Sequence, residues 1–337
     1  MKTIIQDNTI LFGPVSALIA VFCFSTNDVA IKFISKDYAL HLVVLIRSLV
    51  GLMVLFMFIV PLSGGVKVLY TNRLGLHLLR GLCVVFANIT FFLGLAALPL
   101  AEGVAIFFIS PLLITIFSVI FLKEIVGPRR WAAVTIGLIG VLVILRPGSA
   151  TFQAASLLPL SAAFGYATLH MLTRYIGKTE SAASLSFYIQ LTFFGVCLMS
   201  GLILGDGKFS GWSDPSLEFL FRAWSWPSSD HYSILILIGT TSAFGGFFIS
   251  QAYRMSEAAV VAPFEYIALP IAIFWGVLVF GEWPDKTTFI GIALILGSGL
   301  YIIWRETILK DAETPKIPRY RRSVSYTHLT LPTICSV

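Results

Sequence analysis

Several charged side chains lie inside long apolar stretches of the sequence, and the types of three of them suggest ligand binding. They are Asp28, Arg47 and Glu265. A charged group in such a stretch costs at least about 2.5 kcal/mol on membrane-insertion scales, so each is a candidate for function. A carboxylate can hold a proton or a cationic group, and the planar guanidinium of arginine holds carboxylates well.

Glu265 is the sharpest of these candidates. No lysine or arginine lies within four positions of it, and Pro263 and Pro270 flank it. The prolines leave backbone carbonyls without helical partners, and irregular backbone at membrane depth is tolerated where it lines a cavity. We expect Glu265 to bind substrate or a proton, with a buried structural hydrogen bond as the alternative. Tyr266 and Trp275 could supply aromatic walls, although ordinary packing explains Trp275 equally well.

A second candidate group lies near the start of the chain. Asp28 and Lys32 are four residues apart and share one helix face, with Asn27 beside them. Arg47 on the following helix is expected at the same depth, where it could pair with Asp28 or with a ligand carboxylate. Two structural alternatives remain for the first pair: Lys32 staples its own helix to Asp28, or it extends to the membrane surface.

Other polar residues in apolar stretches complete the candidate binding set: Asn88, Tyr188 and Gln190. Arg80 lies close to a helix end and is expected to be an interfacial anchor. The four cysteines have no metal-like spacing, and the sequence has no phosphate loop, zinc motif or nucleophile–base pair. We therefore expect no cofactor, no metal and no catalytic residues, and an enzyme is not predicted.

The elements that must position these residues are membrane-spanning helices. The chain has 337 residues, of which 57% are hydrophobic and 12% charged, whereas soluble domains carry roughly 25% charged residues. A spanning helix needs about 20 mainly apolar residues. Ten such runs occur, at 10–34, 41–62, 76–98, 101–122, 130–145, 154–174, 182–204, 233–253, 258–280 and 287–304. The sequence predicts an all-α integral membrane protein of ten helices, without a cleaved signal peptide.

Orientation follows from the lysines and arginines in the connections, which favour the cytoplasmic side. If the N-terminus is cytoplasmic, that side holds ten: Lys2, Lys67, Arg73, Lys123, Arg129, Arg130, Arg174, Lys178, Arg254 and Arg305. The other side holds five: Lys36, Arg146, Lys208, Arg222 and Lys286. We expect both termini in the cytoplasm of a bacterium, with the protein in the inner membrane. The net charge of +6 is therefore a topology signal and does not indicate nucleic-acid binding.

The two halves of the chain contain an internal repeat. Residues 91–124 can be laid on residues 247–282 with a two-residue insertion: each segment begins with a phenylalanine pair, runs through a proline-containing helix and closes on a glutamate, Glu124 or Glu282. Each half has five helices, so the second half must enter the membrane from the opposite side. Such inverted repeats place substrate where the halves meet, near the midplane.

The repeated segments resemble the EamA family of the drug/metabolite transporter superfamily. The resemblance is carried by FLGLAALPLAEGVAIFFISPLLITIFSVIFLKE with GLIGVLVILRPG, and by AYRMSEAAVVAPFEYIALPIAIFWGVLVFGE with GIALILGSGLYIIWRE. It implies a secondary transporter working by alternating access on metabolites such as amino acids, sugars, purines, cofactors or drugs. The APFEY segment, together with Asn27, Asp28 and Lys32, resembles members proposed to carry amino-acid-like or S-adenosylmethionine-like substrates.

The expected organisation is one repeat at 10–146, a second at 154–306, and a disordered tail at 307–337 whose last 15 or so residues look non-native. A small molecule and the lipid bilayer are the expected partners, with proton coupling as an option and a monomer or homodimer as the assembly. Two alternatives remain: a flippase for a lipid carrier, which shares the fold, and an intramembrane enzyme. A cavity that opens sideways to lipid would favour the flippase.

Overall fold

The computed structural model describes residues 2–122, 127–149, 153–176, 180–255 and 264–313. All regular elements among them are helical. The first half contains α1 (Lys2–Ile34), α2 (Leu40–Val54), a π-helical turn (Leu55–Ile59), α3 (Val60–Leu62), α4 (Leu74–Ala97), α5 (Leu100–Phe107), α6 (Ser110–Leu122) and α7 (Pro128–Leu145). The second contains α8 (Leu157–Ile176), α9 (Ala182–Leu204), α10 (Pro215–Phe221), α11 (Tyr232–Met255), α13 (Ala268–Phe280) and α14 (Lys286–Glu313). Three short 3₁₀ turns occur at Val66–Leu69, Ala154–Ser156 and Ser229–His231.

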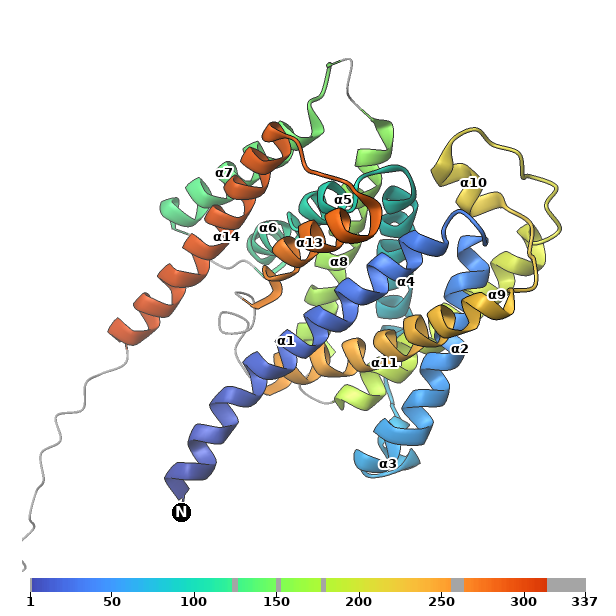
Figure 1. Ribbon diagram of the computed structural model, residues 1–337. Coiled ribbons are helices and arrows are strands. Elements are labelled where there is room, and N and C mark those ends of the chain that lie inside the picture. Colours follow the sequence, from blue (N-terminus) through green and yellow to red (C-terminus); the bar gives the residue numbers. More distant parts are fainter. Residues whose placement is uncertain (1, 123–126, 150–152, 177–179, 256–263, 314–337) are drawn as a thin grey trace, which may run out of the picture.

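The helices form one bundle with two ends (Figure 1). The α10 side carries α10 and the turn between α1 and α2. The opposite, α3 side carries α3, the first residues of α1 and the far end of α14. Seven helical stretches in the described residues are long and apolar enough to cross a membrane, and three shorter apolar helices accompany them, at Trp131–Leu145, Ala268–Phe280 and Lys286–Tyr301. The prediction of an all-α, multi-helix membrane protein is confirmed.

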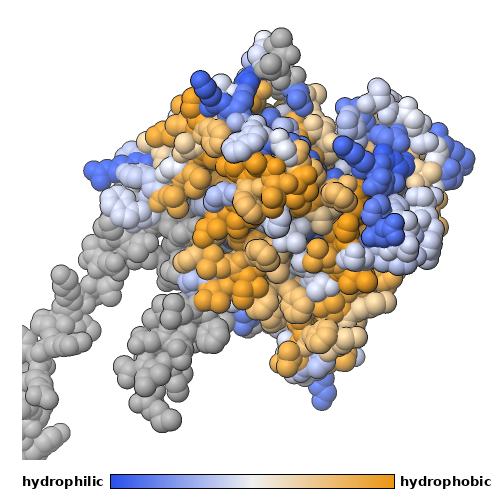
Figure 2. All heavy atoms as spheres, viewed as in Figure 1, coloured by the Kyte–Doolittle hydropathy of each residue, from blue (hydrophilic) through white to orange (hydrophobic). Residues whose placement is uncertain are grey.

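The surface of the bundle matches a bilayer environment. Large apolar side chains such as Phe22, Met57 and Leu202 are exposed, and Figure 2 shows a broad hydrophobic surface between more polar ends. A water-soluble monomer rarely exposes a contiguous apolar area of this extent, because exposure to water is costly. Lipid tails solvate such side chains without that cost.

Helix packing follows the inverted repeat. If α1, α4 and the helices after them correspond to α8, α11 and their successors, then the pairs α1–α11 and α4–α8 are equivalent. Both pairs are in extensive contact. The pairs α2–α9 and α7–α14 each join equivalent helices of the two halves, and these also pack together. The contact between α2 and α11 likewise has its counterpart in the contact between α4 and α9.

The fourth predicted helix is broken, and the ninth is broken at the matching place. Turns replace helix at Phe108–Ile109 in the first half and at Tyr266–Ile267 in the second, positions that the repeat alignment equates. Proline lies shortly after each turn, at Pro111 and Pro270, where its missing N–H weakens the helical ladder. The Phe108 and Tyr266 rings meet, with centroids 5.4 Å apart. The two breaks therefore lie against each other inside the bundle.

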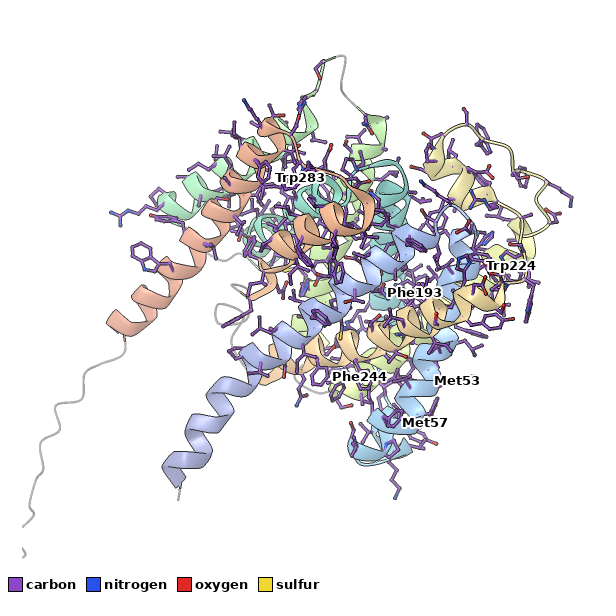
Figure 3. All side chains as sticks on the ribbon, in the orientation of Figure 1. Met53, Met57, Phe193, Trp224, Phe244 and Trp283 are labelled. Atoms are coloured by element: carbon purple, nitrogen blue, oxygen red, sulfur yellow. The ribbon has the colours of Figure 1, made fainter. Side chains whose placement is uncertain are left out.

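A loop between α9 and α11 covers part of the α10 side. Ser216 in α10 donates to the Leu93 carbonyl oxygen at 2.8 Å, and Arg222 donates to the Ser35 carbonyl oxygen at 2.9 Å. The Trp224 indole N–H donates to His41 Nδ1 at 2.9 Å, and Figure 3 shows Trp224 and Trp283 on the α10 side with Phe193 inside the bundle. These bonds fasten the loop to the first half of the chain. The prediction of a disordered tail at 307–337 is wrong for residues 307–313, which are helical as the end of α14, and residues 314–337 lie outside the described residues.

Candidate functional site

Arg47 is the most deeply buried cation of the candidate set, with 3% of its surface exposed. Its Nη1 donates to Asn88 Oδ1 at 3.3 Å. The guanidinium carbon lies 4.4 Å from the Phe193 ring centroid and 5.5 Å from that of Phe92, so two ring faces favour the positive charge. Its Nε and Nη2 are buried without a hydrogen-bond partner. Leaving such donors unpaired is costly, and a ligand carboxylate would satisfy both at once.

Asp28 faces the same region from α1. It interacts electrostatically with Arg47, but no direct ion pair joins these two described residues. The two charges therefore interact without a direct ion pair, which leaves each available to a group of opposite sign. An ammonium near Asp28 and a carboxylate near Arg47 would fit the arrangement.

Gln190 and Asn27 extend this group along neighbouring helices. Gln190 Nε2 donates to the Ser242 hydroxyl at 3.1 Å, whereas its Oε1 is buried without a partner. A Cβ on Gly51 would lie 2.9 Å from Gln190 Nε2, so the glycine makes room for the amide. Asn27 Nδ2 donates to the Ile238 carbonyl oxygen at 2.8 Å. Asn27 therefore joins α1 to α11, and the Gln190 side-chain oxygen remains available as a hydrogen-bond acceptor.

Glu265 belongs to a second group, nearer the α3 side. It is half-buried just before the break at Tyr266 and interacts electrostatically with Tyr166 and Tyr266. Arg80 interacts in turn with Tyr166 and His170. It is 4% exposed and donates to the Thr173 hydroxyl at 2.8 Å and to the Leu185 carbonyl oxygen at 3.1 Å. The expectation that Arg80 is an interfacial anchor is wrong, because its guanidinium turns into the bundle.

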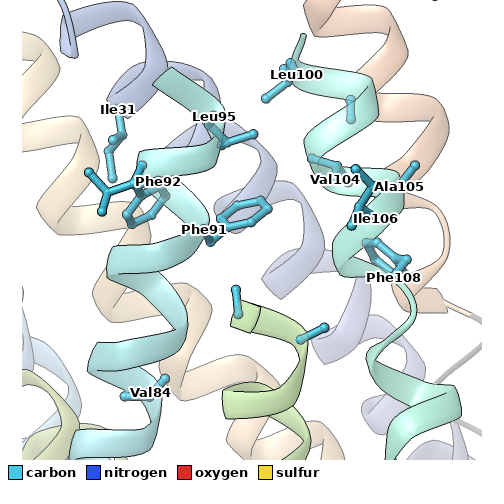
Figure 4. Close-up of a cluster of buried hydrophobic side chains, with 14 of the residues drawn as sticks. Ile31, Val84, Phe91, Phe92, Leu95, Leu100, Val104, Ala105, Ile106 and Phe108 are labelled. Carbon is cyan, nitrogen blue, oxygen red and sulfur yellow. The ribbon is translucent and has the colours of Figure 1, made fainter. Parts of the chain in front are cut away.

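A row of aromatic rings connects the two groups. It begins beside Arg47 at Phe92, which lies 5.7 Å from Phe91. Phe91 is 4.9 Å from Phe107, and Phe107 is 5.1 Å from Tyr166, the neighbour of Glu265. Figure 4 shows Phe91 on the side of α4 that faces α5. Flat ring faces of this kind suit a planar or cationic part of a ligand.

Three further predicted residues lie apart from Arg47. Tyr266 is 2% exposed, and its unpartnered hydroxyl points at Gly299, where a Cβ would clash at 2.0 Å. Trp275 lies further along α13, with its indole N–H buried and unpartnered. Tyr188 donates to the Leu69 carbonyl oxygen at 3.0 Å and packs on His77. The structure does not bring Tyr188 or Trp275 to the Asp28–Arg47 group.

Lys32 does not pair with Asp28 on its own helix. Its ammonium bonds to Glu282, which is 250 residues away, at 2.8 Å. Sequence reasoning missed this partner, and the only signal for it was the glutamate that closes each repeat. Phe92 and Phe193 were also missed, because nothing in their spacing separates them from ordinary core phenylalanines. Among the described residues, no three His, Cys, Asp or Glu side chains gather to hold a metal.

The model of the EamA-like transporter family matches twice, at residues 11–146 and 153–304. The chain belongs to the EamA-like transporter family. It is accordingly a multi-pass membrane protein of a bacterial transporter family, with ten helices in two repeats, and a transporter rather than an enzyme.

Individual relatives within this family carry different names. A protein of Rickettsia prowazekii (strain Madrid E) named S-adenosylmethionine uptake transporter is 28% identical over 88% of this chain and 94% of its own. A riboflavin transporter of Vibrio cholerae serotype O1 is 30% identical over 88% of this chain and 94% of its own. A crystal structure at 18% identity aligns with a TM-score of 0.63 over 88% of this chain and 98% of its own, which shows a shared fold.

Proposed function

We propose that this transporter moves a small zwitterionic metabolite, such as an amino acid or an S-adenosylmethionine-like compound, across the bacterial inner membrane by alternating access. The observation that carries the proposal is the pair of opposite charges at Asp28 and Arg47, which interact without direct contact. Arg47 keeps two buried donors unpartnered. A buried charge without full hydrogen bonding is destabilising, so a ligand that supplies both charges completes the site.

Two further features support a substrate larger than a simple amino acid. The ring row from Phe92 to Tyr166 offers flat faces beyond Arg47, and Glu265 lies at its far end. A cationic group or a proton would be held there by the carboxylate. The name of the Rickettsia prowazekii relative agrees with a ligand that combines a zwitterion with a ring.

Transport by purified protein in proteoliposomes tests the proposal. We expect saturable uptake of labelled S-adenosylmethionine or of an amino acid, and little uptake of riboflavin, which has no zwitterionic group. Metabolite profiling of cells with and without the protein selects which zwitterions to label. Saturable riboflavin transport together with no uptake of any zwitterion would contradict the proposal.

Orientation is part of the proposal and yields a prediction of its own. The excess of lysine and arginine favours both termini in the cytoplasm, which places the α10 side outside. A reporter fused after Arg305 should be active only in the cytoplasm, and one inserted near Asp214 only outside. An external signal from the fusion after Arg305 would overturn the orientation or the even number of crossings.

A further inference from the structure

An ion pair joins the two repeats at the outer end of the bundle. Lys32, near the last turn of α1, donates to Glu282 Oε1 at 2.8 Å and to Oε2 at 2.9 Å. It also donates to the Leu98 carbonyl oxygen at 2.6 Å, where α4 ends. Its side chain is 9% exposed, and the Phe280 ring lies 4.9 Å from the ammonium. The lysine is therefore fully engaged and largely shielded from water, unlike a surface pair of little energetic value.

Glu282 makes this contact a junction of four helices. It follows α13 directly, and its Oε2 accepts the backbone N–H of Leu100, the first residue of α5, at 2.9 Å. The carboxylate therefore caps the start of α5, where an anion is favourable, while it neutralises Lys32. Breaking the pair would release α1, α4 and α5 of the first repeat from α13 of the second.

A second pair joins the repeats on the same side. Arg146, just after α7, is bonded to Asp285, which precedes α14. Burial raises the pKa of the Asp285 carboxyl. Hydrogen bonds from Thr288, Arg146 and Thr287 lower this pKa by a larger amount, so that it lies well below its ordinary value. Between the two pairs lies a cavity of 230 Å³ lined by residues that include Pro99, Glu102, Arg146, Glu282, Trp283 and Asp285.

The Lys32 pair lies directly outward of the candidate substrate group. Asp28 and Lys32 are one turn apart on the same face of α1, which corresponds to about 6 Å along the helix. A substrate that reaches Asp28 and Arg47 from the outer side would pass the Lys32–Glu282 junction. Leu95 of α4 lies one turn inward of Leu98 and is 1% exposed. It fills the space beside Gly103 of α5, and Figure 4 shows its side chain on α4.

We propose that Lys32 and Glu282 form the outer gate of this transporter, closed in the present structure and opened when the repeats separate on that side. The Arg146–Asp285 pair is a second latch at the rim of the same cavity. The gate rests on the proposed transport function, because a gate has meaning only where a substrate must pass. When the gate opens, the shielded ion pair is replaced by two hydrated side chains. A ligand or the membrane potential can shift the equilibrium between the closed and open states.

Labelling of a buried cysteine tests the gate without any substrate. The four native cysteines are replaced by alanine, and Leu95→Cys places one thiol beneath the junction. A membrane-impermeant thiosulfonate is then applied to intact cells from outside. We expect slow labelling with the ion pair intact and a rate at least about tenfold higher with Glu282→Gln or Lys32→Met, because weakening a latch raises the open population.

Lys208→Met is the matched control, since Lys208 pairs with Asp206 on the exposed outer loop and should leave the rate unchanged. Gel filtration and thermal stability establish that each variant is folded. If one of the two gate variants does not fold, the labelling rate of the other still tests the gate. An unchanged labelling rate in a folded gate variant would overturn the gate. Failure of the proposed transport function is recognised separately, as absent zwitterion uptake in the wild type.

Discussion

Replacement of Arg47 by lysine is expected to abolish most transport although the positive charge is retained. The arginine guanidinium offers two further donors in one plane, Nε and Nη2, and both are buried without a partner. A lysine ammonium is a point charge that cannot present that fork to a carboxylate. Loss of a buried, hydrogen-bonded charge contact costs about 2 kcal/mol or more, which corresponds to roughly 30-fold in affinity. Initial rates in proteoliposomes measure the effect.

The control for this substitution is Arg129→Lys, since Arg129 is exposed near the start of α7 and its change should leave the rate unaltered. Normal transport by folded Arg47→Lys would show that charge alone suffices and would remove the carboxylate-binding role.

Substitutions of Asp28 test the same site, because the charges of Asp28 and Arg47 interact. Asp28→Ala and Arg47→Ala should each reduce transport or folding, and exchange of the two charges should partly restore it. Strictly additive losses in the double alanine variant would mean that the residues act independently.

The second large effect is expected for Glu265→Gln. Glu265 lies half-buried at the break of the ninth helix, against Tyr166 and Tyr266. The amide has nearly the same shape, so the fold should persist, but it can neither bind a proton nor neutralise a cationic group. We expect transport to fall at least about tenfold, equivalent to roughly 1.4 kcal/mol of lost differential binding. Initial rates across a pH series should vary with pH in the wild type and become insensitive in the variant.

Asp230→Asn is the comparison for Glu265→Gln, because it also removes one carboxylate but lies exposed between α10 and α11. If Glu265→Gln transports normally with the pH profile of the wild type, Glu265 is structural and carries neither substrate nor proton.

The sequence predicts the repeated architecture because its signals are local. Apolar runs of membrane length, paired prolines and the two closing glutamates are each readable within one segment. The breaks at Phe108 and Tyr266 were not predicted, although Pro111 and Pro270 lie shortly after them and the structure places the two breaks at equivalent positions. Exact helix ends were less predictable, since the turn type at a break depends on what packs against it.

The contacts between distant segments could not be predicted in the same way. Lys32 pairs with Glu282, which is 250 residues away in the sequence, and only the packing of α1 against α13 brings them together. Arg80 appeared to lie at a helix end, but its environment is set by α8 and α9 through Thr173 and Leu185. Sequence spacing gives the depth of a residue along its own helix. It does not give the direction in which the side chain points within the bundle.

Recognition of a zwitterion by Asp28 and Arg47 is the central claim, and competition against uptake tests it most directly. Uptake of the labelled zwitterionic substrate is measured in proteoliposomes with three unlabelled competitors: the substrate itself, its analogue without the carboxylate, and its analogue without the ammonium group. The substrate should compete fully, and each analogue should compete at least about 30-fold more weakly, because each leaves one buried charge unpaired. Equal competition by the analogue that lacks the carboxylate would contradict the claim.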